Sequence, residues 1–267
     1  MKKINNILLF SFLISVIFSV NSCVIFKPKN QDSGKTDSAK INPVTLKNRT
    51  FKDLRFGSLR LGKYVYKAVI EKKDKTEEAK VFREIKYQFG NLTLTEDTYA
   101  PSEKMSDKYV LDSNSLLPMY RNLSVGVDEV VNINFSVNSL EGFVVYSTGK
   151  SPFDIKIKNP VYGDGYSLEI VLTLLPLKKG YKVNIPFFDY RVEDIREVVA
   201  EVIDIEDVRT VNGTISCYKV IVTDSDFEIS DKYWISDKDY PVIVKSEVGS
   251  IFDKKIRIKK LELVEVY

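Results

Sequence analysis

The sequence predicts a mainly β fold: a single curved antiparallel sheet, or a half-open or closed β-barrel (a β-clam), with one buried helix near residues 166–175. Several short segments alternate apolar and polar residues with the period of two that marks a half-buried strand. Turn-forming residues separate these segments at short intervals, which favours antiparallel neighbours. One further segment has the apolar content and end signals of a buried helix.

The strands nearest the N-terminal part of the domain are predicted from alternation. In residues 63–70, one face carries Tyr64, Tyr66, Ala68 and Ile70. Four more segments show the same pattern, and each is followed or preceded by glycine, asparagine, serine or threonine: 81–89, 130–137, 143–147 and 153–157. We expect these segments to form a meander.

The helix is predicted from the apolar run Leu168–Leu175. Asp164 or Ser167 can cap its start, and Pro176 ends it because proline cannot continue a helix. The run is apolar almost all round, so we expect the helix to be buried against the sheet.

The C-terminal part of the domain is predicted to be antiparallel strands as well. Residues 195–203 fit a helical stripe, but Asn212-Gly213 is a strong hairpin signal, and the run 199–211 that enters it should therefore be a strand. Residues 232–236, 242–247 and 255–267 are predicted as further strands.

The first 22 residues have the features of a secretory leader. Lys2 and Lys3 precede an apolar stretch from Ile7 to Val20, which is shorter than the roughly 20 residues that a membrane-spanning helix needs. The tetrad Val20-Asn21-Ser22-Cys23 resembles the bacterial lipobox, so we expect cleavage before Cys23 and lipidation of its thiol. A plain secretory leader is the alternative interpretation.

The lipid on Cys23 would be the membrane anchor, since several acyl chains on one residue bind a bilayer stably. Val24 replaces the aspartate that resembles an inner-membrane retention signal, so the predicted location is the outer membrane, facing the periplasm or the surface. Residues 23–48 are predicted to be a lipidated N-terminus and flexible tether, in which Ser38 lies in a short sequence that resembles a glycosylation acceptor. Residues 49–267 are predicted to be one β-rich domain.

The composition excludes several functions. The chain has no histidine, which removes histidine-based catalysis and most zinc chemistry. Its formal net charge is +3, and Lys2 and Lys3 supply two of those charges, so nucleic acid is not an expected partner. We assign no catalytic, cofactor-binding or metal-binding residue and expect no enzymatic activity. Cys217 is predicted to be a small buried side chain.

Three weaker motifs have ordinary structural interpretations. Gly149-Lys150-Ser151 lacks the spacing of a phosphate-binding loop and is predicted to be a hairpin turn. The basic residues among 254–260 are predicted to form the solvated face of a strand. Asp224-Ser225-Asp226 and the acidic run 203–207 lack the glycine and terminal glutamate of a calcium loop, so they are predicted to be turn and surface residues.

Three stretches occur in the order found in a known family: 112–118, the helix running into 175–180, and the hairpin 211–220 followed by Trp234-Ile235-Ser236. Together they resemble the uncharacterised periplasmic DUF3108 family over residues 51–267. That family is distantly similar to the outer-membrane lipoprotein carriers and localisation factors. The resemblance implies a curved antiparallel sheet around a hydrophobic interior, and a strand at 199–211. It implies no catalytic residue.

Three hypotheses about function follow. The first is a non-enzymatic envelope lipoprotein that binds an apolar or lipid-like ligand on the concave face of its sheet, which the 15 tyrosines and 15 phenylalanines favour. The second is a structural or protein-interaction module with a filled core and an envelope protein as partner. The third is a carboxylate-based glycan hydrolase. The interior volume of the sheet discriminates between the first two.

Overall fold

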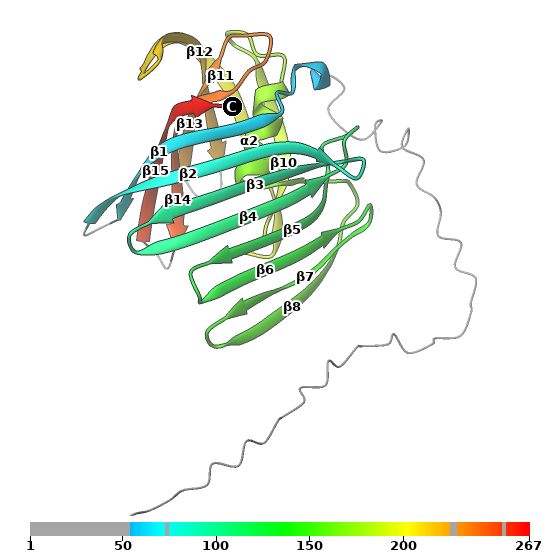
Figure 1. The fold of residues 1–267 in the computed structure, drawn as a ribbon. Helices are drawn as coiled ribbons and strands as arrows, with labels where there is room; N and C mark the ends of the chain where they lie inside the picture. The colour runs from blue at the N-terminus through cyan, green and yellow to red at the C-terminus, as the bar shows by residue number, and fades with distance from the viewer. Residues whose placement is uncertain (1–53, 73–74, 225–228, 253–254) are drawn as a thin grey trace, which may run out of the picture. The chain divides into compact units, whose positions relative to one another are not determined.

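Fifteen strands form one sheet in the part of the chain that the structure, a computed structural model, describes: residues 54–72, 75–224, 229–252 and 255–267 (Figure 1). These residues belong to one compact unit, Ile41–Tyr267. The predicted leader, Cys23, the tether and Ser38 lie outside the described residues. Within the described ranges, no helix is long and apolar enough to cross a bilayer.

The first half of the sheet follows the short 3-10 helix η1 (Phe56–Ser58), and its strands are β1 (Gly62–Lys72), β2 (Lys75–Gln88), β3 (Asn91–Ala100), β4 (Glu103–Leu111), β5 (Pro118–Val125), β6 (Glu129–Phe135), β7 (Ser139–Tyr146) and β8 (Gly149–Lys156). The second half contains β9 (Tyr162–Gly163), helix α2 (Gly165–Leu174), β10 (Lys182–Asp189), β11 (Asp194–Thr210), β12 (Gly213–Asp224), β13 (Ile229–Ser236), β14 (Ile243–Phe252) and β15 (Lys255–Val266).

The order of strands is a meander that turns back on itself. Strands β1 to β8 lie side by side in sequence order, β15 pairs with β1, and β14 to β9 continue away from it. All pairs are antiparallel except the short parallel pair of β9 and β10. The sheet ends at β8 and β9 and is not closed into a barrel, so the predicted fold is confirmed in the form of a curved antiparallel sheet.

Alternation decides which side chains face the interior, as the sequence predicts. On β1, Tyr64, Tyr66, Ala68 and Ile70 are each at most 3% exposed, while the residues between them face outward. Each fully buried side chain of this size stabilises the fold by about 1.5–3 kcal/mol relative to exposure. The inner face of the sheet is therefore the core of the domain.

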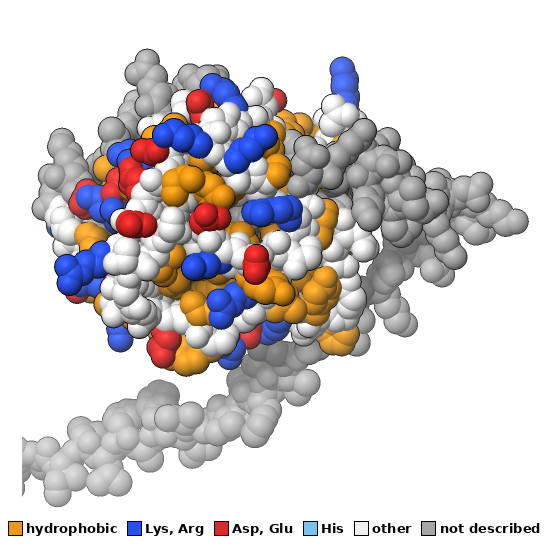
Figure 2. All heavy atoms as spheres, turned by 90° about the horizontal axis from the view of Figure 1, so that it is seen from above, with side chains coloured by type: hydrophobic (Ala, Val, Ile, Leu, Met, Phe, Trp, Pro, Cys, Tyr) orange, Lys and Arg blue, Asp and Glu red, His pale blue; other side chains and the backbone are white. Residues whose placement is uncertain are grey.

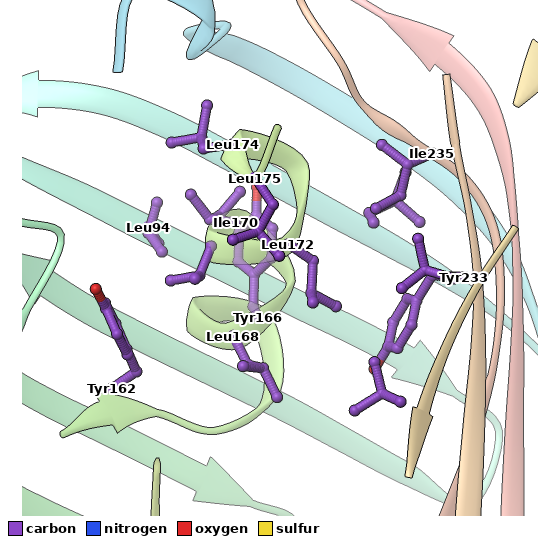
Figure 3. Close-up of a cluster of buried hydrophobic side chains, with 14 of the residues drawn as sticks. Leu94, Tyr162, Tyr166, Leu168, Ile170, Leu172, Leu174, Leu175, Tyr233 and Ile235 are labelled. Carbon is purple, nitrogen blue, oxygen red and sulfur yellow. The ribbon is translucent and has the colours of Figure 1, made fainter. Parts of the chain in front are cut away.

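Helix α2 crosses this inner face between the two halves of the sheet, where the sequence predicts a buried helix. Figure 3 shows Leu94 of β3 on one side of the helix and Tyr233 and Ile235 of β13 on the other. Every residue of the helix after Gly165 is buried. Asp164 is the N-cap residue, and the helix ends at Leu174. The C-cap residue Leu175 is extended because Pro176 follows it.

A second apolar cluster joins strands β5 to β8 of the first half to β10 of the second half. It contains Leu123, Ile133 and Leu140 together with Phe188 of β10 and the adjacent Tyr190. The Phe153 and Phe188 rings lie 5.6 Å apart. Strands β6 to β8 therefore pack against β10 across the interior, although they are far from it in the order of the sheet.

The outer face carries the smaller apolar cluster that contains Cys217. This thiol is fully buried with Val208, Trp234 and Val244, which confirms the prediction of a small buried side chain. Burial raises the pKa of the Cys217 thiol to about 12, so it stays protonated at neutral pH. Lys245 covers the Trp234 ring at 4.4 Å.

The hairpin of β11 and β12 confirms the predicted strand, which ends at Thr210, one residue before the predicted end, but its turn is not the type I′ turn that Asn-Gly usually signals. Thr210 pairs with Gly213, so Val211 and Asn212 are the loop residues. A type I′ turn needs a positive φ at both loop residues, and among the described residues only Gly213 of this hairpin has one, at 116°. The glycine follows the turn instead of lying within it.

Candidate functional site

A cavity of about 610 Å³ lies on the inner face of the sheet beside the first turn of helix α2. Apolar side chains from both halves of the sheet line much of it, among them Leu123, Val125, Phe187, Val198 and Leu261. Its walls also carry five cationic side chains, Arg83, Arg121, Arg191, Arg196 and Lys259, and eight carboxylates, Glu96, Asp107, Glu129, Asp164, Glu169, Asp189, Asp224 and Asp231. The site is thus both apolar and densely ionised.

Arg83 of β2 is the centre of the first ionic group. Its Nε donates to Glu96 Oε2 at 2.6 Å on the neighbouring strand, and its Nη1 donates to Glu169 Oε2 at 2.5 Å on helix α2. Lys259 Nζ donates to Glu96 Oε1 at 2.6 Å. The guanidinium lies over the Tyr166 ring at 4.5 Å. This group ties the helix to both halves of the sheet.

The pKa values of the two carboxylates that share Arg83 are shifted in opposite directions. Burial alone would raise the pKa of Glu96, but Arg83 and Lys259 outweigh it and hold the pKa at about 2. Burial raises the pKa of Glu169, and Arg83 offsets that rise only in part. Glu96 is therefore ionised at neutral pH.

Arg121 of β5 is the centre of the second group. Its Nε and Nη2 donate to the two carboxylate oxygens of Asp107 at 3.0 and 2.8 Å, and its Nη1 donates to Asp164 at the start of helix α2. Tyr109 Oη donates to the same Asp164 oxygen at 2.8 Å. Asp164 therefore uses its side chain to bind the sheet, and makes no side-chain capping bond to the helix that it precedes.

Gly163 allows this arrangement. A Cβ atom at this position would lie 2.5 Å from Cε1 of the Tyr109 ring. Because real Cβ atoms do not approach so closely, only glycine lets the chain before the helix pass over Tyr109.

The third group lies on the other half of the sheet. Arg191 Nε donates to Asp189 Oδ1 at 2.9 Å, and Arg196 Nη1 donates to Asp189 Oδ2 at 3.3 Å. Arg196 also pairs with Asp224. Arg191 Nη2 lies 3.9 Å from Asp164, so the second and third groups are connected.

Two cavity carboxylates have no cationic partner among the described residues. Glu129 of β6 is 6% exposed and accepts a hydrogen bond from Tyr190 Oη at 2.9 Å. Asp231 of β13 accepts a hydrogen bond from the backbone N–H of Gly249 at 2.8 Å. Burial raises the pKa of Asp231 to about 7, although the Gly249 bond acts against the rise.

The structure corrects two interpretations of sequence motifs. Lys259 is not on a solvated strand face, because it points inward to Glu96 and lines the cavity. Asp224 is not a surface residue either, since its side chain pairs with Arg196 at the cavity wall. The hairpin interpretation of Gly149-Lys150-Ser151 is confirmed, because these residues begin β8 directly after a turn.

No cavity residue was assigned a functional role from the sequence. The one residue that was, Cys23, lies outside the described residues, where its lipidation stays a prediction. Within the described ranges, no group of three or more cysteine, aspartate or glutamate residues has the arrangement of a metal site. The carboxylates instead bind arginine, lysine, tyrosine and backbone groups.

Comparison with known proteins gives one family and several solved structures, of which two are described below. The family described as "Protein of unknown function (DUF3108)" matches residues 76–252. Among curated proteins, none matches the chain.

Two solved structures match over most of their length. A Bacteroides fragilis protein, described as a presumed exported protein with a YmcC-like fold, is 11% identical, with 78% of this chain and 97% of that chain covered and a TM-score of 0.29. A presumed lipoprotein from Parabacteroides distasonis is 11% identical, with 80% and 99% covered and a TM-score of 0.28. At these values neither relationship extends to function.

We expect Arg121→Met to destabilise the domain by about 3–5 kcal/mol, because it leaves Asp107 and Asp164 buried without their cation. Urea unfolding followed by circular dichroism measures this change. Lys156→Met is the matched control, since Lys156 and its partner Asp154 are both largely exposed, and we expect little effect. An equally small effect of Arg121→Met would contradict the structural role of this group.

Asp231 makes stability depend on pH. The folded carboxyl keeps its proton up to about pH 7, whereas an unfolded aspartate ionises near 3.8. Its contribution to stability is therefore complete below about pH 4 and is lost as the pH rises to about 7, up to about 4 kcal/mol in all.

We expect Asp231→Asn to match the wild type near pH 4 and to be the more stable protein at pH 8. Urea unfolding at both pH values measures the difference, and Asp154→Asn on the exposed part of β8 is the control. A difference between Asp231→Asn and wild type that does not change with pH would refute this assignment.

Proposed function

We propose a function for this chain, which belongs to the DUF3108 family of proteins of unknown function: it is a non-enzymatic lipoprotein of the cell envelope that binds a lipid-like molecule in the cavity on the inner face of its sheet. The observation that carries the proposal is the cavity itself. Its volume of about 610 Å³ lies within the roughly 300–1,000 Å³ of small-molecule sites. A module with a filled core would not leave such a space beside its only described α-helix.

The lining of the cavity favours a molecule with both an apolar and a polar part. Leu123, Phe187 and Leu261 offer apolar surface from three different regions of the sheet. A purely apolar ligand would leave the ionic groups beside it without water, which is costly for charged side chains. An amphipathic ligand can place its chain on the apolar surface and its polar end at the charged residues.

The predicted leader and the predicted lipidation signal support a location in the cell envelope. Residues 1–22 have the order of a secretory leader, and Val20-Asn21-Ser22-Cys23 fits a lipidation signal. We propose that the lipid on Cys23 anchors the chain to the outer membrane, that residues 23–48 serve as a tether, and that the domain faces the periplasm or the surface. Figure 2 supports an absence of nucleic-acid partners, since lysine and arginine side chains are intermixed with aspartate and glutamate on the face it shows.

The protein-interaction alternative depends on the open edge of the sheet. Strand β8 is such an edge, and partner strands can add to exposed edges. However, β8 contains Pro152, Lys150 and Lys156, and proline and lysine are the residues by which natural edge strands discourage pairing. The edge therefore supports this alternative less well than the cavity supports ligand binding.

The glycan-hydrolase alternative needs two carboxylates that are free to act as acid and base. Six of the eight cavity carboxylates contact arginine or lysine, which leaves Glu129 and Asp231. Asp231 has the raised pKa of a general acid. Glycan hydrolysis by the wild type that is lost in both Glu129→Gln and Asp231→Asn would favour this alternative.

We expect a lipid-like molecule to remain bound in native mass spectrometry of protein purified under mild conditions, and Val248→Trp to reduce binding of added decanol at least tenfold. Val248 lines the cavity from β14, so an indole there occupies the space that the ligand needs. Glu247→Trp, on the opposite face of the same strand, is the control and should bind normally. A wild type with no bound or bindable amphiphile would refute the proposed function.

We expect Cys23→Ser to release the chain from the membrane, since no thiol remains for acylation. Fractionation of cells into soluble and membrane material measures this, with Cys217→Ser as the control because Cys217 is buried on the outer face of the sheet. A Cys23→Ser protein that stayed in the membrane fraction would contradict the lipid anchor and leave ligand binding by the domain unaffected.

A further inference from the structure

We propose that the cavity selects an amphiphile whose polar end is a positively charged amine or quaternary ammonium, and that Glu129, flanked by Tyr190 and Tyr146, holds this end. The inference rests on the proposed function, because it names the class of molecule that the cavity binds. Two observations support it: the distribution of charged side chains on the cavity walls, and the residues that surround Glu129.

The cavity carries fewer cationic side chains than carboxylates. Its walls carry five cationic side chains against eight carboxylates, and against seven when Asp231, whose pKa is about 7, holds its proton. All five cations already contact carboxylates: Arg83 and Lys259 bind Glu96 and Glu169, and Arg121, Arg191 and Arg196 bind Asp107, Asp164, Asp189 and Asp224. An anionic headgroup would have to displace one of these carboxylates, whereas a cationic headgroup supplies the charge that the cavity lacks.

Glu129 is the carboxylate best placed to receive that charge. It is 6% exposed and lines the cavity, and within the described ranges it forms no ion pair. Its hydrogen bond from Tyr190 occupies Oε1. A buried carboxylate without a counter-ion is costly, and a ligand cation would remove that cost.

The residues around Glu129 suit an ammonium on an alkyl chain. Val125 is its cross-strand partner on β5, and Leu123 lies on the same face of β5 two pairs further along. On the other side, Val130 pairs with Val145, and Glu129 and Tyr146 are the residues next to this pair on β6 and β7. Burial and the charge of Glu129 raise the pKa of Tyr146, so the two side chains interact. Tyr146 is 42% exposed and lines the cavity, so its ring is accessible to a cation.

Three 10-carbon probes test the proposal: decylamine, decanol and decyl sulfate, each below its micellar concentration. Binding to the full chain carrying Cys23→Ser is measured by isothermal titration calorimetry at pH 7.5. We expect decylamine to bind at least tenfold more tightly than decanol, and decyl sulfate to bind most weakly. Decyltrimethylammonium should share the preference of decylamine, because the charge and the aromatic contact do not require an N–H.

Glu129→Gln removes the charge while keeping an oxygen that can accept the Tyr190 bond. We expect it to lower the affinity for decylamine about tenfold and to leave the affinity for decanol unchanged. Glu141→Gln, on the exposed side of neighbouring β7, is the control and should not alter either affinity. Circular dichroism checks that each variant is folded, and Tyr146→Leu gives a second, independent test through a smaller loss of decylamine binding.

The outcomes separate this inference from the proposed function. Binding of decanol or decyl sulfate at least as tight as that of decylamine, or an unchanged decylamine affinity in Glu129→Gln, would overturn the inference and leave ligand binding in place. No binding of any of the probes would overturn both.

Discussion

The attachment of helix α2 to the sheet through buried arginines is the constraint on which the rest of this structure depends. Arg83 and Arg121 reach the helix and its N-cap residue from β2 and β5, and both guanidinium groups are at most 5% exposed. Buried ion pairs of this kind contribute little net stability, because desolvation offsets their attraction. Their geometry, however, attaches the helix to the sheet at two points, Glu169 and Asp164. The helix position in turn determines how much interior remains as cavity.

A row of ionised residues across neighbouring strands produces this attachment. Arg83 pairs in register with Glu96, and Glu96 pairs in register with Asp107. Two adjacent carboxylates would repel each other, but each has its own arginine on the strand beyond it. The inner face of the sheet therefore carries both apolar clusters and a row of charged side chains, which is why its interior can be both a hydrophobic core and a polar site.

The sequence was sufficient to predict the parts of this fold that depend on local pattern. The alternation of β1, the end signals of helix α2 and the hairpin of β11 and β12 involve residues that are close in the chain. Strands β3, β4, β5, β9 and β10 were not predicted, and on β3 and β5 the reason is physical. Glu96 and Arg121 occupy inward positions, where alternation leads one to expect apolar residues.

A related reason prevented prediction of the site from the sequence. Its partners lie far apart in the chain: 86 residues separate Arg83 from Glu169, and 163 separate Glu96 from Lys259. No spacing rule connects such residues, and an arginine that will be buried looks in the sequence like one that will be solvated. The sequence therefore predicted an apolar cavity, whereas the cavity in the structure is lined by both apolar and charged side chains.

The position of β8 and β9 at opposite edges of the sheet has a consequence for how the interior can be reached. These two strands are consecutive in the chain, and only residues 157–161 join them. A chain of that length spans at most about 20 Å when fully extended, so the two edges cannot move further apart than this at the point where the link joins them. Ile157 and Val161 at its ends are packed into the second apolar cluster. Residues 157–161 thus hold β8 and β9 together at one end of the gap between the two edges. If this gap widens to admit a molecule, the movement must be a hinge about the 157–161 link.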